Sequence, residues 1–396
     1  MSMQEKLASR SRGTEHSKIR QVAAMIQRNG GIDLGQGTCA LPPHPYVLEA
    51  GQRAIAHGFN TYTASDGIRE LKDAIVRRYA AYNQLQLETA NILVTCGATG
   101  AFESICKCFL APGDEVILLE PSYLGHLKQI ADRGAVARYV RLHAPAWTLD
   151  FGDLERAITP RTKLLVISNP NNPTGKVFTR HELQTIGEIC KRAGVIVISD
   201  EVYEYILAED RTHISIASLP GMFDHAITIS SASKTLFVTG WRIGWAVAPP
   251  EIIRALAIKS DETYVCAPAP LQKGVADSLC MDETFFDSIR LPFQQMRRKL
   301  CEALRDAGLT PSDPDGTYYV LAGYEQYGFK DDDEAMLTLM KNTSVACVPG
   351  NAFYPTGTHS GLLRFCFAVE DSVLDEACKR LRTTPSVCAK AACTVA

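Results

Sequence analysis

The sequence predicts an α/β fold, in which a large domain with a mostly parallel seven-stranded sheet between helices is joined to a smaller α+β domain. Apolar runs rich in Val and Ile alternate with helical periodicity between Asn91 and Ala248. This alternation is typical of a parallel sheet that is covered on both faces. The length of 396 residues also exceeds what one simple hydrophobic core supports.

The candidate strands are short and apolar. They span residues 92–95, 115–119, 136–140, 163–168, 195–199, 226–230 and 245–248. Apolar residues at helical spacing predict helices over residues 17–29, 45–57, 68–83 and 285–307, and strand-like runs follow at 316–322, 344–350 and 362–368. We expect an N-terminal arm and part of the small domain in residues 1–44, the large domain in 45–285, and the small C-terminal domain in 286–396.

The composition is that of an ordinary globular protein, with 46% hydrophobic and 21% charged residues. A net charge of -3 gives no electrostatic reason to expect nucleic acid or an anionic membrane as a partner. The first residues form a charged arm without the apolar stretch of a secretory signal. The 13 cysteines are scattered and form no metal-binding pattern, which favours reduced thiols and a cytoplasmic location over structural disulfides.

A lysine among serines is the first candidate for chemistry. Lys234 follows an apolar strand in the segment S-S-A-S-K, and Arg242 follows in a turn bounded by glycines. Burial lowers the pKa of a lysine and makes its neutral, nucleophilic amine accessible, which suits bonding to a carbonyl cofactor. Taken alone, the segment is more typical of a surface lysine that follows a strand.

Three further segments end predicted strands, where open α/β sheets place their ligands. C-G-A-T-G-A, residues 96–101, leads into a helix whose start favours a phosphate. N-P-N-N-P-T-G, residues 169–175, is a rigid turn that can present the amide of Asn172. Asp200 ends a buried strand and needs a partner, either a protonated ring nitrogen of a ligand or a Lys or Arg of the protein.

Taken in order, these motifs resemble those of the class I/II aminotransferases, which are pyridoxal-phosphate enzymes of fold type I. The matching segments are Tyr62, G-A-T-G-A, Tyr123, N-P-N-N-P-T-G, S-D-E-V-Y, S-A-S-K, G-W-R and L-R-F-C-F-A. The resemblance covers nearly the whole chain, from about Ile32 to Phe367. Each motif alone is common, but their order and spacing together are specific.

The resemblance implies a role for each matching residue. Lys234 corresponds to the lysine that forms a Schiff base with pyridoxal 5'-phosphate and moves the substrate proton, and Asp200 to the carboxylate that keeps the pyridine nitrogen protonated. The residues that correspond to the other cofactor contacts are Tyr203 and Asn172 at the ring oxygen, Ala98, Thr99, Ser231 and Arg242 at the phosphate, and Tyr123 stacked on the ring.

Four more residues extend the implied site. His126 is a candidate second partner of Asp200, and Tyr62 corresponds to a tyrosine that reaches the phosphate of the neighbouring subunit, which implies a homodimer. Arg364 corresponds to the arginine that binds the substrate α-carboxylate in a bidentate manner. Gly35 lies where the family brings its backbone close to that carboxylate. Each of these residues also has a purely structural alternative. Tyr123 and Tyr203 would then be aromatic residues of the core, and Arg364 would belong to a buried ion pair.

The expected activity is transfer of an amino group from an L-amino acid to a 2-oxo acid. After Gly37 the family usually continues with Pro and an acidic residue, whereas this chain has T-C-A-L-P-P, and Ala64 replaces a usual proline. No second arginine can be placed from the sequence for a distal carboxylate. Neutral, aromatic or sulfur-containing substrates are therefore favoured over strictly acidic ones. The alternatives are a lyase on the same fold, such as a carbon–sulfur β-lyase or an aminocyclopropane-carboxylate-synthase-like enzyme, and a non-catalytic pyridoxal-phosphate sensor.

Overall fold

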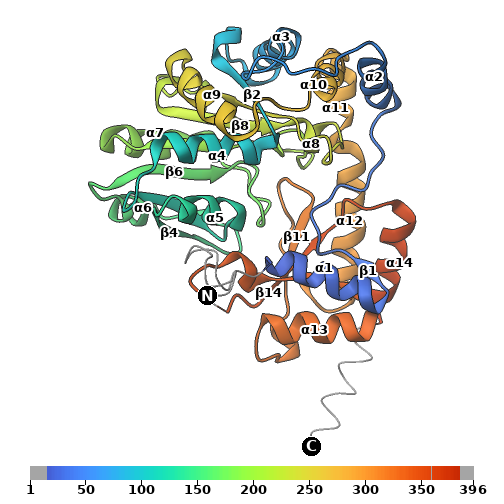
Figure 1. Cartoon of the computed structure of the whole chain (residues 1–396). Coiled ribbons are helices and arrows are strands. Elements are labelled where there is room, and N and C mark those ends of the chain that lie inside the picture. Colours follow the sequence, from blue (N-terminus) through green and yellow to red (C-terminus); the bar gives the residue numbers. More distant parts are fainter. Residues whose placement is uncertain (1–15, 358, 384–396) are drawn as a thin grey trace, which may run out of the picture.

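The computed structural model describes residues 16–357 and 359–383, and its main feature is one large sheet between helices (Figure 1). Residues 1–15 of the predicted N-terminal arm lie outside the described residues. The strands of the large sheet are β2 (Ile92–Thr95), β3 (Glu115–Glu120), β4 (Val136–His143), β5 (Thr148–Leu149), β6 (Thr162–Ser168), β7 (Ile196–Asp200), β8 (Ala226–Ser231) and β9 (Gly244–Val247).

The large sheet has eight strands in the order β2-β9-β8-β7-β6-β3-β4-β5. Strands β4, β3, β6, β7 and β8 pair in parallel, while β9 runs antiparallel to both of its neighbours. The predicted fold class is confirmed, and all seven predicted strands are present with small shifts of their ends. The prediction of seven strands was one short, because β5 has two residues and therefore no apolar periodicity to reveal it.

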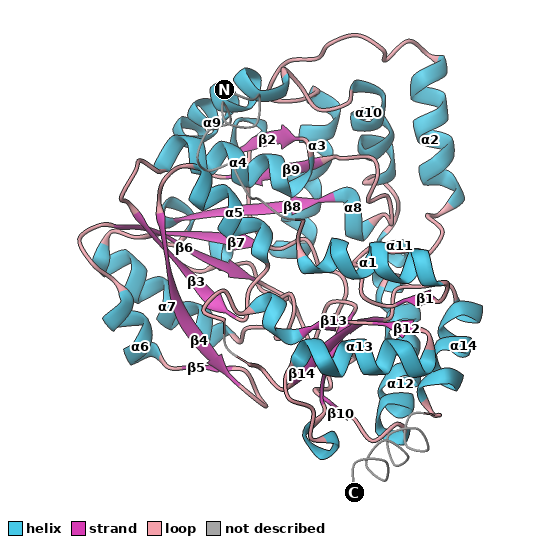
Figure 2. Ribbon diagram, turned by 60° about the horizontal axis from the view of Figure 1, so that its bottom comes forward, coloured by secondary structure: helices cyan, strands magenta, loops and turns pink. Residues whose placement is uncertain are grey.

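Helices cover both faces of the large sheet (Figure 2). Alternate residues of a strand point to opposite faces. In β3, Val116 and Leu118 belong to a core cluster shared with α4 (Gly97–Phe109), α5 (Leu124–Asp132) and α9 (Pro250–Tyr264). Ile117 and Leu119 belong to a second cluster shared with α6 (Phe151–Ala157) and α7 (Arg180–Ala193) on the other face. The continuous apolar runs of the strands follow from this double burial.

The C-terminal part of the chain forms a smaller sheet in the order β10-β11-β14-β13. Its strands and those of a separate two-stranded pair are β10 (Thr310–Pro311), β11 (Tyr319–Gly323), β13 (Val348–Pro349), β14 (Leu362–Cys366), β1 (Ile32–Asp33) and β12 (Val345–Ala346). Because β1 pairs in parallel with β12, the start of the described chain lies beside its end, as Figure 1 shows. The predicted strand at 344–350 is thus two short strands in different sheets.

The remaining helices complete the fold. They are α1 (Lys18–Asn29), α2 (Pro45–Ala56), α3 (Arg69–Arg78), α8 (Ala232–Thr235), α10 (Ala269–Ser278), α11 (Glu283–Ser288), α12 (Arg290–Asp306), α13 (Asp332–Thr343) and α14 (Asp371–Leu381). The single helix predicted over residues 285–307 is two helices, α11 and α12. The helix predicted over 68–83 ends as an α-helix at Arg78 and continues as one π-helical turn, Tyr79–Asn83. Within the described residues, no helix combines the length and the apolar character needed to cross a bilayer.

Candidate active site

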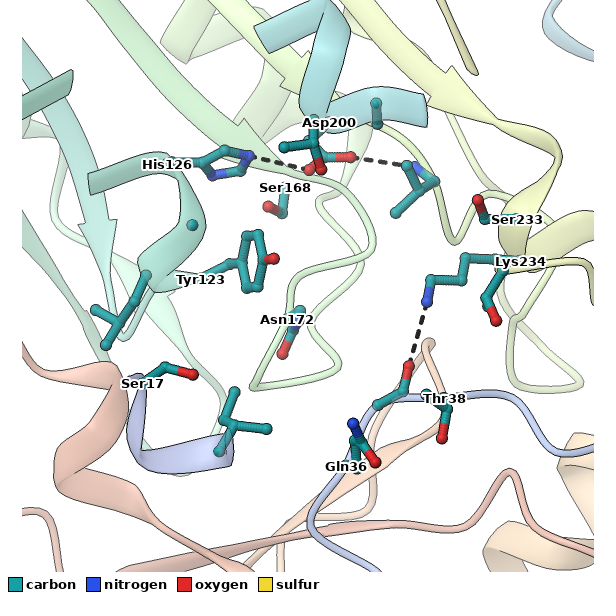
Figure 3. A pocket seen from close by; sticks show the side chains of 18 of the residues that line it. Ser17, Gln36, Thr38, Tyr123, His126, Ser168, Asn172, Asp200, Ser233 and Lys234 are labelled. Atoms are coloured by element: carbon teal, nitrogen blue, oxygen red, sulfur yellow. Dashed lines mark hydrogen bonds and ion pairs between the residues drawn. The ribbon is translucent and has the colours of Figure 1, made fainter. Parts of the chain in front are cut away.

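A cavity of about 460 Å³ lies at the carboxyl ends of the central strands (Figure 3). Ser168, Asp200 and Ser231, the last residues of the adjacent strands β6, β7 and β8, all line it. The opposite wall comes from the start of α1, from the loop after β1, and from Arg364 of β14. The cavity therefore lies where the large sheet meets the C-terminal elements, and a ligand in it would contact both.

Asp200 is buried at the base of this cavity with a histidine beside it. Its Oδ2 lies 3.2 Å from Nε2 of His126 on α5. The amide of Val202 donates to Oδ1 at 3.4 Å. Among the described residues, no lysine or arginine forms an ion pair with Asp200. The carboxylate is therefore held in place without a lysine or arginine partner among the described residues, and a protonated ring nitrogen of a ligand would satisfy it.

Lys234 extends into the cavity from α8 (Figure 3). Its Nζ donates to the carbonyl oxygen of Gly37 at 3.3 Å. Burial lowers the pKa of Lys234 from 10.5 to about 8, and the charge of Arg242 acts in the same direction. A larger fraction of the amine is therefore neutral and nucleophilic near physiological pH than in an exposed lysine.

One end of the cavity is built for an anion. Ala98 and Thr99, in the first turn of α4, line it together with Ser231 and Arg242. Free N–H groups and the dipole of a helix start favour negative charge. A side chain on Gly97 would collide with the guanidinium of Arg242, so glycine at this position lets the arginine approach the helix start. Donor groups and positive charge converge here as a phosphate requires.

Arg364 is a buried cation without a carboxylate partner among the described residues. It donates to Oδ1 of Asn172 at 3.0 Å and to the carbonyl oxygen of Gly35 at 2.8 Å. Its Nε is buried and has no hydrogen-bond partner, and the guanidinium carbon lies 4.0 Å from the ring centroid of Tyr319. The described residues therefore contain no structural ion pair of Arg364. The charge of this arginine is available to an anionic ligand.

Aromatic rings form the sides of the cavity. The ring of Tyr123, which precedes α5, packs edge-on against His126 with centroids 5.4 Å apart. A side chain on Gly125 would collide with this ring, so glycine there leaves room for it. The hydroxyl groups of Tyr203 and Tyr319 lie 3.2 Å apart, and both residues line the cavity.

The structure brings almost all of the predicted site residues together. Those that line the cavity are Ala98, Thr99, Tyr123, His126, Asn172, Asp200, Tyr203, Ser231, Lys234, Arg242 and Arg364. Gly35 reaches it through the carbonyl oxygen that accepts from Arg364. Tyr62 does not line it: this residue lies in the loop between α2 and α3 with 83% of its surface exposed.

Sequence reasoning missed two parts of the cavity wall. Tyr319 contacts Tyr203 and Arg364, but in the sequence it is one of two tyrosines in a strand-like run, G-T-Y-Y-V-L-A. Ser17 and Arg20 line the cavity from the start of α1, about two hundred residues before Lys234 in the chain. Neither position carries a local motif, since each becomes a wall residue only through the packing of distant elements.

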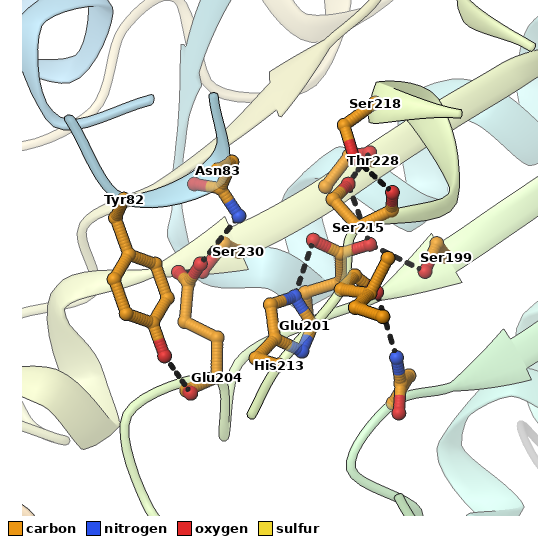
Figure 4. A network of polar contacts seen from close by, with 12 residues as sticks. Tyr82, Asn83, Ser199, Glu201, Glu204, His213, Ser215, Ser218, Thr228 and Ser230 are labelled. Carbon is orange, nitrogen blue, oxygen red and sulfur yellow. Dashed lines mark hydrogen bonds and ion pairs between the residues drawn. The ribbon is translucent and has the colours of Figure 1, made fainter. Parts of the chain in front are cut away.

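A network of buried charges involves residues that are adjacent in sequence to Asp200, Tyr203 and Ser231 of the cavity (Figure 4). Glu201, the neighbour of Asp200, accepts a hydrogen bond from Ser215 at 2.9 Å and lies 3.1 Å from Nε2 of His213. Glu204, the neighbour of Tyr203, accepts from Ser230 at 2.9 Å. The network thereby joins the turn after β7 to the end of β8, the two segments that carry Asp200 and Ser231.

The fold and this set of groups define the class of protein. A parallel α/β sheet that presents a lysine, a carboxylate and an anion cradle in one cavity is the arrangement of an enzyme that uses pyridoxal phosphate. The chain matches the family described as aminotransferase class I and II over residues 29–381.

Relatives that align with almost the whole chain are also aminotransferases. The chain is 35% identical over 386 residues to a probable N-succinyldiaminopimelate aminotransferase of Mycobacterium tuberculosis, covering 94% of this chain and 97% of that one. It is 32% identical over 409 residues to kynurenine–oxoglutarate transaminase 3 of Mus musculus, covering 95% and 90%. The solved structure of YbdL from Escherichia coli, reported with a methionine aminotransferase function, superposes with a TM-score of 0.92 at 28% identity, covering 95% and 99%.

This chain belongs to the class I and II aminotransferases. It is a pyridoxal-phosphate-dependent transferase, so the expected family, activity and cofactor are confirmed, and a non-catalytic sensor is excluded.

Proposed function

We propose that the enzyme transfers the amino group of a neutral, aromatic or sulfur-containing L-amino acid to a 2-oxo acid, with Lys234 forming the Schiff base to the cofactor. The observation that carries this proposal is the convergence on one cavity of Lys234, Asp200 and Arg364, which has no carboxylate partner among the described residues. An amine, a carboxylate and a carboxylate-binding guanidinium are the three groups that an amino-acid substrate and a pyridine cofactor require.

Each side chain has a distinct role in the proposed site. Pyridoxal phosphate supplies an aldehyde for bonding to amines and a ring that accepts electrons from the substrate Cα. Asp200, supported by His126, holds a proton at the nitrogen atom that faces it. The start of α4, Ser231 and Arg242 bind the phosphate.

The substrate end uses the remaining groups. Arg364 would bind the α-carboxylate, and the amide of Asn172 and the hydroxyl of Tyr203 would donate to the ring oxygen of the cofactor. Lys234, as a neutral amine, would take the proton from the substrate Cα and deliver it to the former aldehyde carbon of the cofactor, which is the work of a general base. Tyr123 would cover one face of the ring.

Two features support the proposed donor class. The buried aromatic wall of Tyr203 and Tyr319 favours an apolar or aromatic side chain over a charged one. The relatives include a kynurenine–oxoglutarate transaminase and an enzyme reported with a methionine aminotransferase function, whose donors are aromatic and sulfur-containing. 2-Oxoglutarate, named for the same relative, is a proposed acceptor.

We also propose a homodimer in the cytoplasm. The exposed apolar side chains of Tyr46, Leu48 and Ile55 on α2 precede the loop that carries Tyr62, so this part of the surface is suited to a second copy of the chain. The cysteines in the described part of the chain are all free thiols, which supports a reducing compartment.

A donor screen tests the proposed activity. Amino acids are added one at a time to the purified enzyme, and conversion of the cofactor to its amino form is followed by absorbance. We expect stoichiometric conversion with aromatic or sulfur-containing donors and reversal by a 2-oxo acid. Release of ammonia and an oxo acid from a single substrate, without the amino form, would instead identify a lyase.

The lysine assignment is tested by substitution. Lys234→Ala should lose transamination by about 10²–10⁴-fold, because the residue supplies both the amine and the proton transfer. The absorbance band of the lysine-bound cofactor should vanish in this variant, and an unchanged band would contradict the assignment. Lys128→Ala, which removes an exposed lysine from the rim of the same cavity, is the control.

A further inference from the structure

The outer rim of the cavity carries charge that the proposed chemistry does not use. The start of α1 forms this rim, and Ser17 lies across the cavity from Lys234 with Asn172 and Tyr123 between them (Figure 3). Arg20 follows in the first turn of α1, exposed to solvent and lining the cavity. The rim is therefore where the far end of a bound substrate would lie.

The charges that line the cavity are mostly positive. Asp200 is the one carboxylate among the described lining residues, whereas the cations are Lys18, Arg20, Lys128, Lys234, Arg242 and Arg364. The proposed function uses Lys234 at the cofactor, Arg242 at the phosphate and Arg364 at the α-carboxylate. Lys18 forms an ion pair with Asp333. This leaves Arg20 and Lys128, for which the described part of the chain provides no ion-pair partner.

Arg20 and Lys128 belong to different walls of the cavity. Arg20 lies in the first turn of α1, on the wall across from Lys234, whereas Lys128 lies on α5, the helix that Tyr123 precedes. Burial raises the pKa of the Tyr123 phenol, and the charge of Arg20 opposes this rise, as do the charges of Arg364 and Arg242.

We propose that Arg20 is the subsite for a second, distal carboxylate, so that the enzyme accepts an amino or 2-oxo dicarboxylic acid between Arg364 and Arg20. This inference rests on the proposed function, because it takes Arg364 as the anchor of the first carboxylate. A guanidinium binds a carboxylate through two parallel hydrogen bonds, a geometry that lysine cannot reproduce. Because Arg20 is exposed, its side chain can turn away and leave the rim open when a neutral substrate binds.

The subsite reconciles two kinds of substrate in one cavity. The aromatic wall near Tyr203 suits a neutral donor, and the arginine at the rim suits an acceptor with a second carboxylate. From the sequence alone, no second arginine could be placed for a distal carboxylate. The structure supplies a candidate because the packing of α1 beside β12 and β13 brings the N-terminal region to the cavity.

Ligand binding tests the subsite without turnover. Glutarate and butyrate, which differ by one carboxylate, are titrated into the enzyme with its cofactor, and binding is followed by the change in cofactor absorbance. We expect the wild type to bind glutarate at least about tenfold more tightly than butyrate, and Arg20→Gln to abolish this preference. Arg20→Lys should retain part of it, and Lys128→Gln and Arg28→Gln should retain all of it.

Steady-state kinetics provide the second readout. Arg20→Gln should raise KM for 2-oxoglutarate about ten- to a hundredfold and leave kcat and KM for pyruvate within about threefold. A preference for glutarate that survives in Arg20→Gln, or that is lost in Lys128→Gln instead, overturns the inference. A general loss of both acceptors in Arg20→Gln also overturns it, because a subsite for the distal carboxylate cannot affect pyruvate. If no amino donor converts the cofactor, while the glutarate preference still depends on Arg20, the proposed function fails and the subsite stands.

Discussion

At the scale of single residues, the site depends on polar groups that are buried without an opposite charge. Arg364 is the clearest case, because its guanidinium donates to one carbonyl and one amide oxygen and packs on an aromatic ring. A buried cation is costly when it has no counter-ion. Under the proposed function, a bound substrate carboxylate would offset this cost, so Arg364 would contribute strongly to substrate binding.

Arg364→Lys should therefore weaken the substrate complex even though it keeps the positive charge. A single ammonium cannot contact Gly35, Asn172 and a carboxylate in the same geometry, and we expect kcat/KM for amino donors to fall about ten- to a hundredfold. Steady-state kinetics with several donors measure this fall. Arg192→Lys, in an exposed ion pair with Glu155, is the matched control and should have no effect. Equal kinetics in Arg364→Lys and wild type would argue that Arg364 does not bind the substrate.

At the scale of elements, the buried strands were the most predictable part of the fold. Their β-branched runs are long enough to show double burial, and the motifs that follow β2, β6, β7 and β8 are local in sequence. The sequence could not predict β5, whose two residues carry no pattern, or the break between α11 and α12. It also could not predict the walls made by Tyr319 and Arg20, because these residues reach the cavity only through the packing of α1 beside β12 and β13 and the pairing of β11 with β14.

The buried network that contains Glu201, Glu204 and His213 makes the stability of the fold depend on pH. Burial raises the pKa of Glu204 from 4.5 to about 7, while Ser230 and the neighbouring His213 act against the rise. Burial opposes the charge on His213, but Glu201 raises the pKa of this histidine above its ordinary value of 6.5. Both groups hold their protons more tightly in the folded protein than in the unfolded chain. Their stabilising effect is therefore present at low pH and is lost as the pH rises through the folded pKa.

Glu204→Gln should remove part of this dependence. Ionisation of the buried carboxylate destabilises the fold as the pH rises from about 5 to about 8, by at most about 3 kcal/mol for a shift from 4.5 to about 7. The variant should thus gain stability relative to wild type at pH 8 and little at pH 5. Thermal unfolding at both values measures this difference, with Glu302→Gln on the surface of α12 as the control. The same pH dependence in wild type and Glu204→Gln would show that Glu204 does not titrate in this range.

At the scale of the whole molecule, the exposed position of Tyr62 is compatible with the proposed homodimer, in which this residue would act in the neighbouring site. Its exposed ring lies outside the cavity, whereas the other predicted cofactor contacts line it. The exposed apolar side chains of Leu48 and Ile55 on α2 precede the same loop. A twofold dimer that buries this surface would bring Tyr62 of each chain toward the site of the other.

Subunit mixing tests this arrangement. Tyr62→Ala and Lys234→Ala are each expected to reduce activity strongly, one in the neighbouring site and one in its own. In a mixed dimer the two substitutions fall in the same site, and the other site is intact. Random exchange yields half mixed dimers with one intact site each, so activity should recover to about a quarter of the wild-type value. Exchange is verified by co-purification of differently tagged chains. If verified exchange restores no activity, Tyr62 does not act across the interface, and its exposed position then needs another explanation.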